Sequence, residues 1–317
     1  MWLGSTDKEL NDKILNKPLL YWLVLLLPAM VIAQGGLDGF LKPADSLQKA
    51  RRNGVVIAEV AVGAATLVGL NQLWYADYPK SDFHFKNDNA EWLQMDKAGH
   101  VFSAYHLGSI GKNALQWSGV SRKNQLIYGS TIGFVFLSAV EVMDGYSSNW
   151  GASVGDVAAN FSGTALFVGQ ELLWKEQRII PKFSFHTTPY ASARPNVLGE
   201  SSAEQLLKDY NGQTYWLSVN LHSFLKESKI PKWLNLAVGY GAEGMITGND
   251  EFVNTVFLPE KERYRQFYFS LDADLTKIET KSHTLKTIFH LFNTIKIPAP
   301  TIEISSGQGF KFRALYF

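Results

Sequence analysis

Two kinds of hydrophobic pattern follow one another along this chain. Between residues 55 and 174, apolar residues recur at helical spacing in four segments separated by polar or glycine-rich stretches. They predict helices over Val55–Trp74, Met95–Trp117, Leu126–Met143 and Val154–Trp174. The first and the fourth are long enough to cross a bilayer, although a bundle buried in a soluble protein would show the same pattern. We therefore expect a membrane-associated bundle of about four helices.

After Pro181 the pattern becomes alternating and rich in aromatic residues. It predicts strands at Trp233–Gly241, Tyr264–Leu275, Thr301–Ser305 and Gly309–Phe317, and short helices near Ala203 and over His283–Phe292. An amphipathic last strand that ends on an aromatic residue resembles the closing strand of outer-membrane barrels. Four or five strands do not make a barrel of the usual minimum of about eight, so a small sheet packed on the helices is the alternative. The expected fold class is α+β.

The first residues predict export. Lys13 and Lys17 precede the apolar run Leu19–Ala33, which ends in small residues before Gln34. This arrangement is typical of a secretory signal peptide, and an uncleaved signal anchor is the alternative. The expected parts of the chain are a signal segment at residues 1–33, a helical domain at 34–178 and a mixed, strand-rich region at 179–317. We expect the protein in the bacterial cell envelope, at the outer membrane or a periplasm-facing membrane rather than in the cytoplasm.

Composition limits the partners and the chemistry. The 30 basic and 29 acidic residues leave a net charge of +1, and no long basic run suggests nucleic acid. Membrane lipids are the expected partners, together with other envelope proteins. The aromatic share of 13% is high, which suits a membrane interface but also an aromatic-rich soluble core. The chain has no cysteine, which excludes disulfides, thiolate chemistry, cysteine-bound zinc and lipidation of an N-terminal cysteine.

Polar side chains inside the apolar helices are the main chemical signal. They form three pairs at a spacing of three or four residues: Asp96 with His100, Glu141 with Asp144, and Asp156 with Asn160. This spacing places each pair on one helical face. If the faces converge, the carboxylates would meet in a medium of low dielectric constant. They would then need protons, a partner such as Lys97, or a cation.

Three interpretations of this cluster remain open. It could lock the order of the helices, with Ser153 capping the fourth one. It could bind a lipid headgroup or small ligand through Asp144, Ser153, Asn160 and Lys97. It could also be a catalytic or metal site formed by Asp96, His100, Glu141 and Asp156, with His100 as the general base. A divalent metal is then the candidate cofactor, although no spacing matches a specific metalloenzyme motif.

Three ordered motifs resemble a known family. They are Asp96-Lys97-Ala98-Gly99-His100, Glu141-Val142-Met143-Asp144-Gly145, and the stretch from Trp150 to Asn160 followed by Gly163. This skeleton is similar to the YfiM-type family of uncharacterised predicted periplasmic proteins, and to the VanZ-like membrane proteins. The resemblance covers roughly residues 75–174 and implies a small, membrane-associated helical domain. It supplies no established mechanism.

The expected function is therefore that of an uncharacterised envelope membrane protein, structural or lipid-binding or ligand-binding. The alternative is a metal-assisted hydrolase or transferase that acts on a lipid-linked or phosphate-containing envelope substrate. The sequence leaves open whether the protein is an enzyme.

Overall fold

The computed structural model describes residues 36–76, 78–249 and 262–317, so the predicted signal segment lies outside the described residues. The chain forms two units, which we describe separately. The smaller unit consists of residues 1–42 and 280–288 and contains helix α3 (Gly36–Leu41) and the first part of α13 (His283–Phe292). Within it, Asp38 accepts hydrogen bonds from Ser282 Oγ at 2.6 Å and from Thr284 N at 2.9 Å. All other elements lie in the larger unit.

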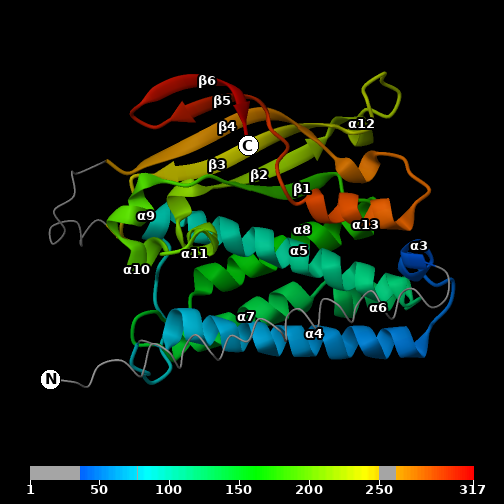
Figure 1. The fold of residues 1–317 in the computed structure, drawn as a ribbon, viewed down its shortest axis with the longest axis horizontal. Helices are drawn as coiled ribbons and strands as arrows, with labels where there is room; N and C mark the ends of the chain where they lie inside the picture. The colour runs from blue at the N-terminus through cyan, green and yellow to red at the C-terminus, as the bar shows by residue number, and fades with distance from the viewer. Residues whose placement is uncertain (1–35, 77, 250–261) are drawn as a thin grey trace, which may run out of the picture. The chain divides into compact units, whose positions relative to one another are not determined.

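Four long helical segments form a bundle on one side of the sheet of the larger unit (Figure 1). They are α4 (Lys49–Leu70) continued by the π-turn η1 (Asn71–Tyr75); α5 (Met95–Trp117), preceded by the 3₁₀ turn η2 (Glu91–Gln94); α6 (Arg122–Asn124), η3 (Gln125–Gly129) and α7 (Ile132–Gly145) in succession; and α8 (Val154–Leu173). The bundle of about four helices that the pattern predicts is therefore present. By length and composition, Lys49–Tyr75 and Arg122–Gly145 could cross a membrane, whereas α8 does not meet the same criterion.

Glycines allow the central helix α5 to lie close to its neighbours. A Cβ atom at Gly163 of α8 would lie 2.2 Å from the carbonyl oxygen of Val101 on α5. A Cβ atom at Gly133 of α7 would lie 2.4 Å from the carbonyl oxygen of Ala104. Neither position can hold a larger residue unless the backbones separate. The polar side chains near these crossings are therefore brought within contact of one another.

The sheet is antiparallel and has six strands in sequential order. Its strands are β1 (Ile179–Phe185), β2 (Gln213–Asn220), β3 (Leu234–Glu243), β4 (Tyr264–Ala273), β5 (Ala299–Ser305) and β6 (Gly309–Tyr316). Short connecting elements are α9 (Pro189–Ala193), α10 (Pro195–Leu198), α11 (Ser202–Lys208), η4 (Tyr210–Gly212), α12 (Leu221–Phe224) and η6 (Leu275–Lys277). The predicted α+β class is confirmed, and the last four strands lie where the alternation predicts them. The first two strands were not predicted.

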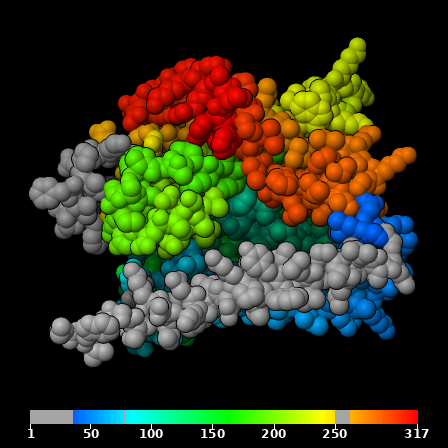
Figure 2. Space-filling model, viewed as in Figure 1, coloured from blue at the N-terminus to red at the C-terminus, as the bar shows by residue number. Residues whose placement is uncertain are grey.

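The sheet curls, so that its first and last strands share one enclosed side. Tyr316 on β6 lies with its ring centroid 6.2 Å from that of Trp216 on β2, although three strands separate them. Tyr316 also stacks on Tyr268 of β4, with ring centroids 4.8 Å apart. We call the side that holds these rings the inner face and the opposite side the outer face. Figure 2 shows β5 and β6, in red, at the surface of the molecule.

Helix α5 packs on the outer face mainly at β1 and β2, and its first residue, Met95, also shares a hydrophobic cluster with Tyr240 of β3. Phe102 lies with its ring centroid 5.8 Å from those of Phe183 and Tyr215. A ring nitrogen of His106 lies 2.7 Å from the carbonyl oxygen of Pro181. The edge of the sheet that follows directly after α8 in the chain is thus the edge that packs on the helices.

A strained turn directly before α5 is hydrogen-bonded to the sheet. Trp92, Leu93 and Gln94 have φ angles of 50°, 50° and 63°, a left-handed conformation that is costly for residues with side chains. The carbonyl of Leu93 accepts hydrogen bonds from Arg265 on β4, at 2.9 Å, and from the hydroxyl of Tyr240 on β3. Strands β3 and β4 therefore hold the residues that lead into the first turn of α5.

Candidate functional site

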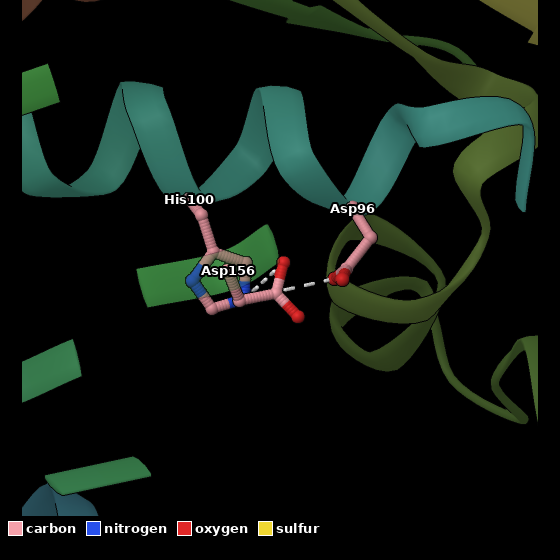
Figure 3. Close-up of side chains that lie close together, drawn as sticks. All are labelled: Asp96, His100 and Asp156. Carbon is pink, nitrogen blue, oxygen red and sulfur yellow. Dashed lines mark ion pairs between the residues drawn. The ribbon is translucent and has the colours of Figure 1, made fainter. Parts of the chain in front are cut away.

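Three helices direct polar side chains to one point near the start of α5 and α8. Asp96 and His100 come from α5, Glu141 from the last turns of α7, and Asp156 and Asn160 from the first turns of α8. Figure 3 shows Asp96, His100 and Asp156 facing one another. Helix α8 begins where it does because Ser153 is its N-cap: its hydroxyl accepts a hydrogen bond from the Asp156 N–H at 3.1 Å.

The imidazole of His100 is the centre of the cluster. Its Nε2 atom lies 3.8 Å from an oxygen of each of three carboxylates, those of Asp96, Glu141 and Asp156. These distances are too long for direct hydrogen bonds. The space between the four groups is therefore ringed by three carboxylate oxygens and one imidazole nitrogen.

Asn160 determines which nitrogen of His100 carries a proton in the neutral ring. The Nδ1 atom of His100 lies 2.9 Å from Asn160 Oδ1, an amide oxygen that can only accept a hydrogen bond. Nδ1 therefore donates, and the lone pair of Nε2 is directed at the carboxylates. Hydrogen bonding by the far nitrogen is the usual way in which proteins orient a metal-binding histidine.

Lys97 supplies positive charge beside the centre. Its ammonium nitrogen lies 2.8 Å from Asp88 and 2.8 Å from Asp156, and 3.3 Å from Asp96. Asp88 also accepts a hydrogen bond from the hydroxyl of Ser153 at 2.6 Å. The sequence reasoning missed Asp88, because it lies in the loop before α5 and shares no helical spacing with the other residues.

The two predicted carboxylates of α7, Glu141 and Asp144, lie in different surroundings. One Glu141 oxygen accepts a hydrogen bond from the Ser153 N–H at 2.9 Å, while its other oxygen, Oε1, is buried without a hydrogen-bond partner among the described residues. Asp144 instead accepts a hydrogen bond from Tyr75 at 2.7 Å. The tyrosine that reaches the centre is Tyr210, which donates to Asp96 at 2.7 Å. Neither tyrosine was among the predicted residues.

Burial and mutual charge set the protonation of the cluster. Burial raises the pKa of Asp156 to about 8, helped by the charge of Asp96, and Lys97 and His100 only partly offset this effect. Burial lowers the pKa of His100, but the three surrounding carboxylates outweigh it and raise that pKa above its ordinary value. Burial alone would raise the pKa of Asp96, but the positive charges of His100 and Lys97 outweigh burial and lower that pKa. The cluster thus retains protons because its negative charge is not fully balanced.

The centre opens on the side of Asp96. The side chain of Asp96 is 25% exposed and that of His100 15%, whereas those of Asp156 and Glu141 are only 5% and 4% exposed. Ligand atoms of Asp96, His100 and Asp156 lie within 4.8 Å of one another. Carboxylate oxygens with one imidazole nitrogen suit zinc or a harder divalent cation. The arrangement is therefore chemically able to hold a cation with one side accessible.

Three other histidines of the larger unit, His84, His106 and His290, have hydrogen-bond partners of their own. His84 lies 2.9 Å from the carbonyl oxygen of Trp150, and His290 lies 2.8 Å from the side-chain nitrogen of Asn113. None of the hydrogen bonds found for these two, or for His106, involves the His100 cluster.

Comparison with known proteins finds one similarity. Residues 83–170 match a family model described as "Predicted periplasmic lipoprotein (DUF2279)". No curated protein and no solved structure matches the chain. The matched segment contains α5, α7, most of α8 and every charged residue around His100. The chain has no cysteine to which a lipid could be attached, and the finer likeness to YfiM-type and VanZ-like proteins stays a prediction. Residues 83–170 are thus similar to an uncharacterised family of envelope proteins, and the predicted location, export to the bacterial cell envelope, is confirmed.

Proposed function

We propose that this envelope protein binds one divalent cation between Asp96, His100, Glu141 and Asp156, and that the bound cation serves hydrolysis or group transfer on a phosphate-containing envelope substrate. One observation carries the cation site. The Nε2 atom of His100 lies 3.8 Å from one oxygen of each of three carboxylates, and these carboxylates come from three helices.

The spacing of these atoms suits coordination. A cation about 2.0–2.4 Å from oxygen and nitrogen ligands holds neighbouring ligand atoms roughly 3–4 Å apart. The nitrogen-to-oxygen distances around His100 fall in this interval. The ligand atoms of Asp96, His100 and Asp156 lie within 4.8 Å of one another, whereas Glu141 is not part of this group and its side chain would have to move closer to complete the site.

Charge balance supports the same proposal. Four carboxylates, those of Asp88, Asp96, Glu141 and Asp156, adjoin one lysine and one histidine. A divalent cation would replace the protons that the raised pKa of Asp156 indicates. The unpartnered oxygen of Glu141 would coordinate the cation. The free-energy cost of burying this oxygen without a partner would then be removed.

The exposed side of the centre suits a phosphate group. A cation bound there would act as a Lewis acid toward a phosphate oxygen. Asp96 is the most exposed of the four proposed ligands, so a substrate would approach beside it. Lys97 lies next to that opening and would attract an anionic group. His100, with Nε2 committed to the cation, would position it rather than act as the general base that the sequence suggests.

The test measures cation binding by the purified full chain in detergent. After dialysis against a chelator, titration calorimetry with Zn²⁺, Mn²⁺, Mg²⁺ and Ca²⁺ should give one site for at least one of these ions. Asp156→Asn should weaken it at least tenfold. Glu171→Gln is the control, because Glu171 is equally buried on α8 but is paired with Lys112 and Arg122. No binding of any of the four ions, or equal loss in both variants, would contradict the proposal.

A purely structural role is the second candidate, and the position of Lys97 favours it. Its ammonium group already contacts two carboxylates at 2.8 Å, as a built-in cation would. In this case Lys97→Met and Asp156→Asn should both lower the melting temperature, and a chelator should leave the unmodified protein unchanged. A chelator that lowers the melting temperature of the unmodified protein would instead favour the bound metal.

A further inference from the structure

We propose that the outer face of the sheet lies in the hydrocarbon of a lipid bilayer, together with the exposed sides of α4 and of the segment Arg122–Gly145. This proposal does not depend on the cation site. It follows from where the apolar and the charged side chains of the larger unit lie.

The outer face of the sheet is apolar and exposed. Ten large apolar side chains alternate along β2 to β6 and are each 37–67% exposed: Leu217, Leu236, Val238, Phe267, Phe269, Leu271, Ile302, Ile304, Phe310 and Phe312. The strand register makes them neighbours, since Val238 pairs with Phe269, Phe269 with Ile302, and Ile302 with Phe312. They form one continuous surface rather than scattered exposed residues, which is unusual for a soluble monomer.

The inner face is buried and holds charged groups beside the rings of Trp216, Tyr268 and Tyr316. Lys182 and Asp272 form an ion pair at 2.7 Å, and neither side chain is exposed. Glu303, also unexposed, pairs with Arg313 at 2.5 Å, and Lys296 is 1% exposed. Enclosed charged groups and an outward-facing apolar surface match what hydrocarbon requires, because charged groups avoid hydrocarbon and apolar groups do not. The free edge of β6 must lie outside the hydrocarbon or be covered, because unpaired backbone groups are costly there.

The lengths of the elements match a bilayer. Strands β3 and β4 have ten residues each and helix α4 has 22. At about 3.3 Å per strand residue and 1.5 Å per helix residue, all three are about 33 Å long. The hydrocarbon core is about 30 Å thick, and spanning strands have about 9–11 residues. In Figure 1 these strands and α4 run across the view in broadly the same direction.

Apolar exposure continues on the helices, away from the sheet. On α4, Ile57, Val60 and Val62 are 65–68% exposed, and in Arg122–Gly145, Tyr128 and Val135 are 68% and 63% exposed. Figure 1 shows α4 and the strands β5 and β6 on opposite sides of the larger unit. A single protein partner would cover one of these sides, whereas a bilayer surrounds the molecule. We therefore assign hydrocarbon, and not a second copy, as the occupant.

Exposed charged and polar residues occur in connections at both ends of the strands. Between β2 and β3 lie the exposed charged residues Lys226, Glu227, Lys229 and Lys232. The turn between β5 and β6 is Ser306-Gly307-Gln308, also exposed. The connection between β2 and β3 also exposes Phe224, Leu225 and Trp233, so charged and apolar residues both occur at this end of the strands.

The absence of cysteine allows a direct test with single labels. Val238→Cys, Phe269→Cys and Ile302→Cys place a fluorophore on the outer face, and Val60→Cys places one on α4. Glu227→Cys is the control at a polar connection. Each full-length protein is labelled with an environment-sensitive dye and reconstituted into phosphatidylethanolamine–phosphatidylglycerol vesicles. In one set of vesicles the acyl chains carry bromine, which quenches dyes within the hydrocarbon.

We expect brominated chains to quench the four test labels several-fold more strongly than the label at residue 227, and aqueous iodide to show the reverse order. The α4 label supplies an independent reading if a sheet variant does not fold. Equal iodide quenching at all five positions would overturn the proposal. So would outer-face labels shielded from both quenchers in a protein that cross-links to a second copy, because the occupant would then be protein.

Discussion

The ammonium group of Lys182 on β1 lies 2.7 Å from a carboxylate oxygen of Asp272 on β4, and neither side chain is exposed to solvent. Lys182 also donates to the carbonyl of Ala273 at 2.7 Å, and Asp272 accepts from the hydroxyl of Ser218 at 2.6 Å. The pair therefore connects strands that are three positions apart in the sheet. It is one reason why the sheet curls around its polar side.

Removal of one partner of this pair should strongly destabilise the protein. Lys182→Met leaves the carboxylate of Asp272 buried with less compensation, which costs about 3–5 kcal/mol of unfolding free energy. Lys182→Met combined with Asp272→Leu should cost less than the single change, because no charge is then stranded. Chemical denaturation in detergent micelles measures both. A double variant that is less stable than the single one would argue against charge burial as the cause.

The crossing of α5 and α8 should depend on the size of residue 163. Gly163→Ala places a methyl group 2.2 Å from the carbonyl oxygen of Val101 and should lower stability by about 1–3 kcal/mol. Gly169→Ala on the same helix is the matched control, since its added atom would meet nothing within 4 Å. That change should stabilise the helix by about 0.5–1 kcal/mol. Thermal unfolding of the two variants should therefore shift in opposite directions.

Asn160 should act through the orientation of His100. Asn160→Ala removes the acceptor for Nδ1–H and should weaken cation binding about 10–100-fold, with little change in the coordinating atoms. Thr164→Val, one turn later on α8 and similarly buried, is the control and should bind as the unmodified protein does. Titration calorimetry measures both. A normal affinity in Asn160→Ala would show that the hydrogen bond has no role in binding.

Cation affinity should rise with pH. In the folded protein without a cation, the pKa of Asp156 is about 8, so Asp156 is protonated below that pH. A cation that binds at lower pH must therefore displace this proton. Affinity should increase by about tenfold per pH unit between pH 6 and 8 if one proton is displaced. Without cation, the same raised pKa means that stability falls as pH rises from about 4 to 8, since the unfolded chain releases this proton first. Asp156→Asn should flatten both trends.

Local pattern predicts the helices and part of the sheet. Met95–Trp117 was predicted with the bounds that α5 has, because its apolar residues keep a helical period between polar boundaries. Strands β1 and β2 were missed because polar or charged residues occupy their buried side. In β1, Pro181 and Lys182 interrupt any apolar run, and in β2 the buried Trp216 breaks the alternation. Strands β3 to β6 keep the alternation of apolar and polar residues and were therefore predicted, although their polar side is the enclosed one.

Spacing also explains which site residues could be predicted. Asp96 and His100, or Asp156 and Asn160, share a face within one helix, so their proximity is visible in the sequence. Asp88 and Tyr210 reach the centre from a loop and from a short turn before β2, and only the tertiary fold brings them there. The bond of Asp144 to Tyr75 likewise depends on how α4 ends.

The left-handed turn at Trp92–Gln94 gives the sheet control over where Asp96 and His100 point. Each such backbone conformation costs about 1–3 kcal/mol, and the hydrogen bonds from Arg265 and Tyr240 to Leu93 help to maintain it. If β3 and β4 shift, this turn is free to relax, and the first residues of α5 rotate with it. A displacement of β3 and β4 would therefore reach Asp96 and His100 through the backbone of Leu93.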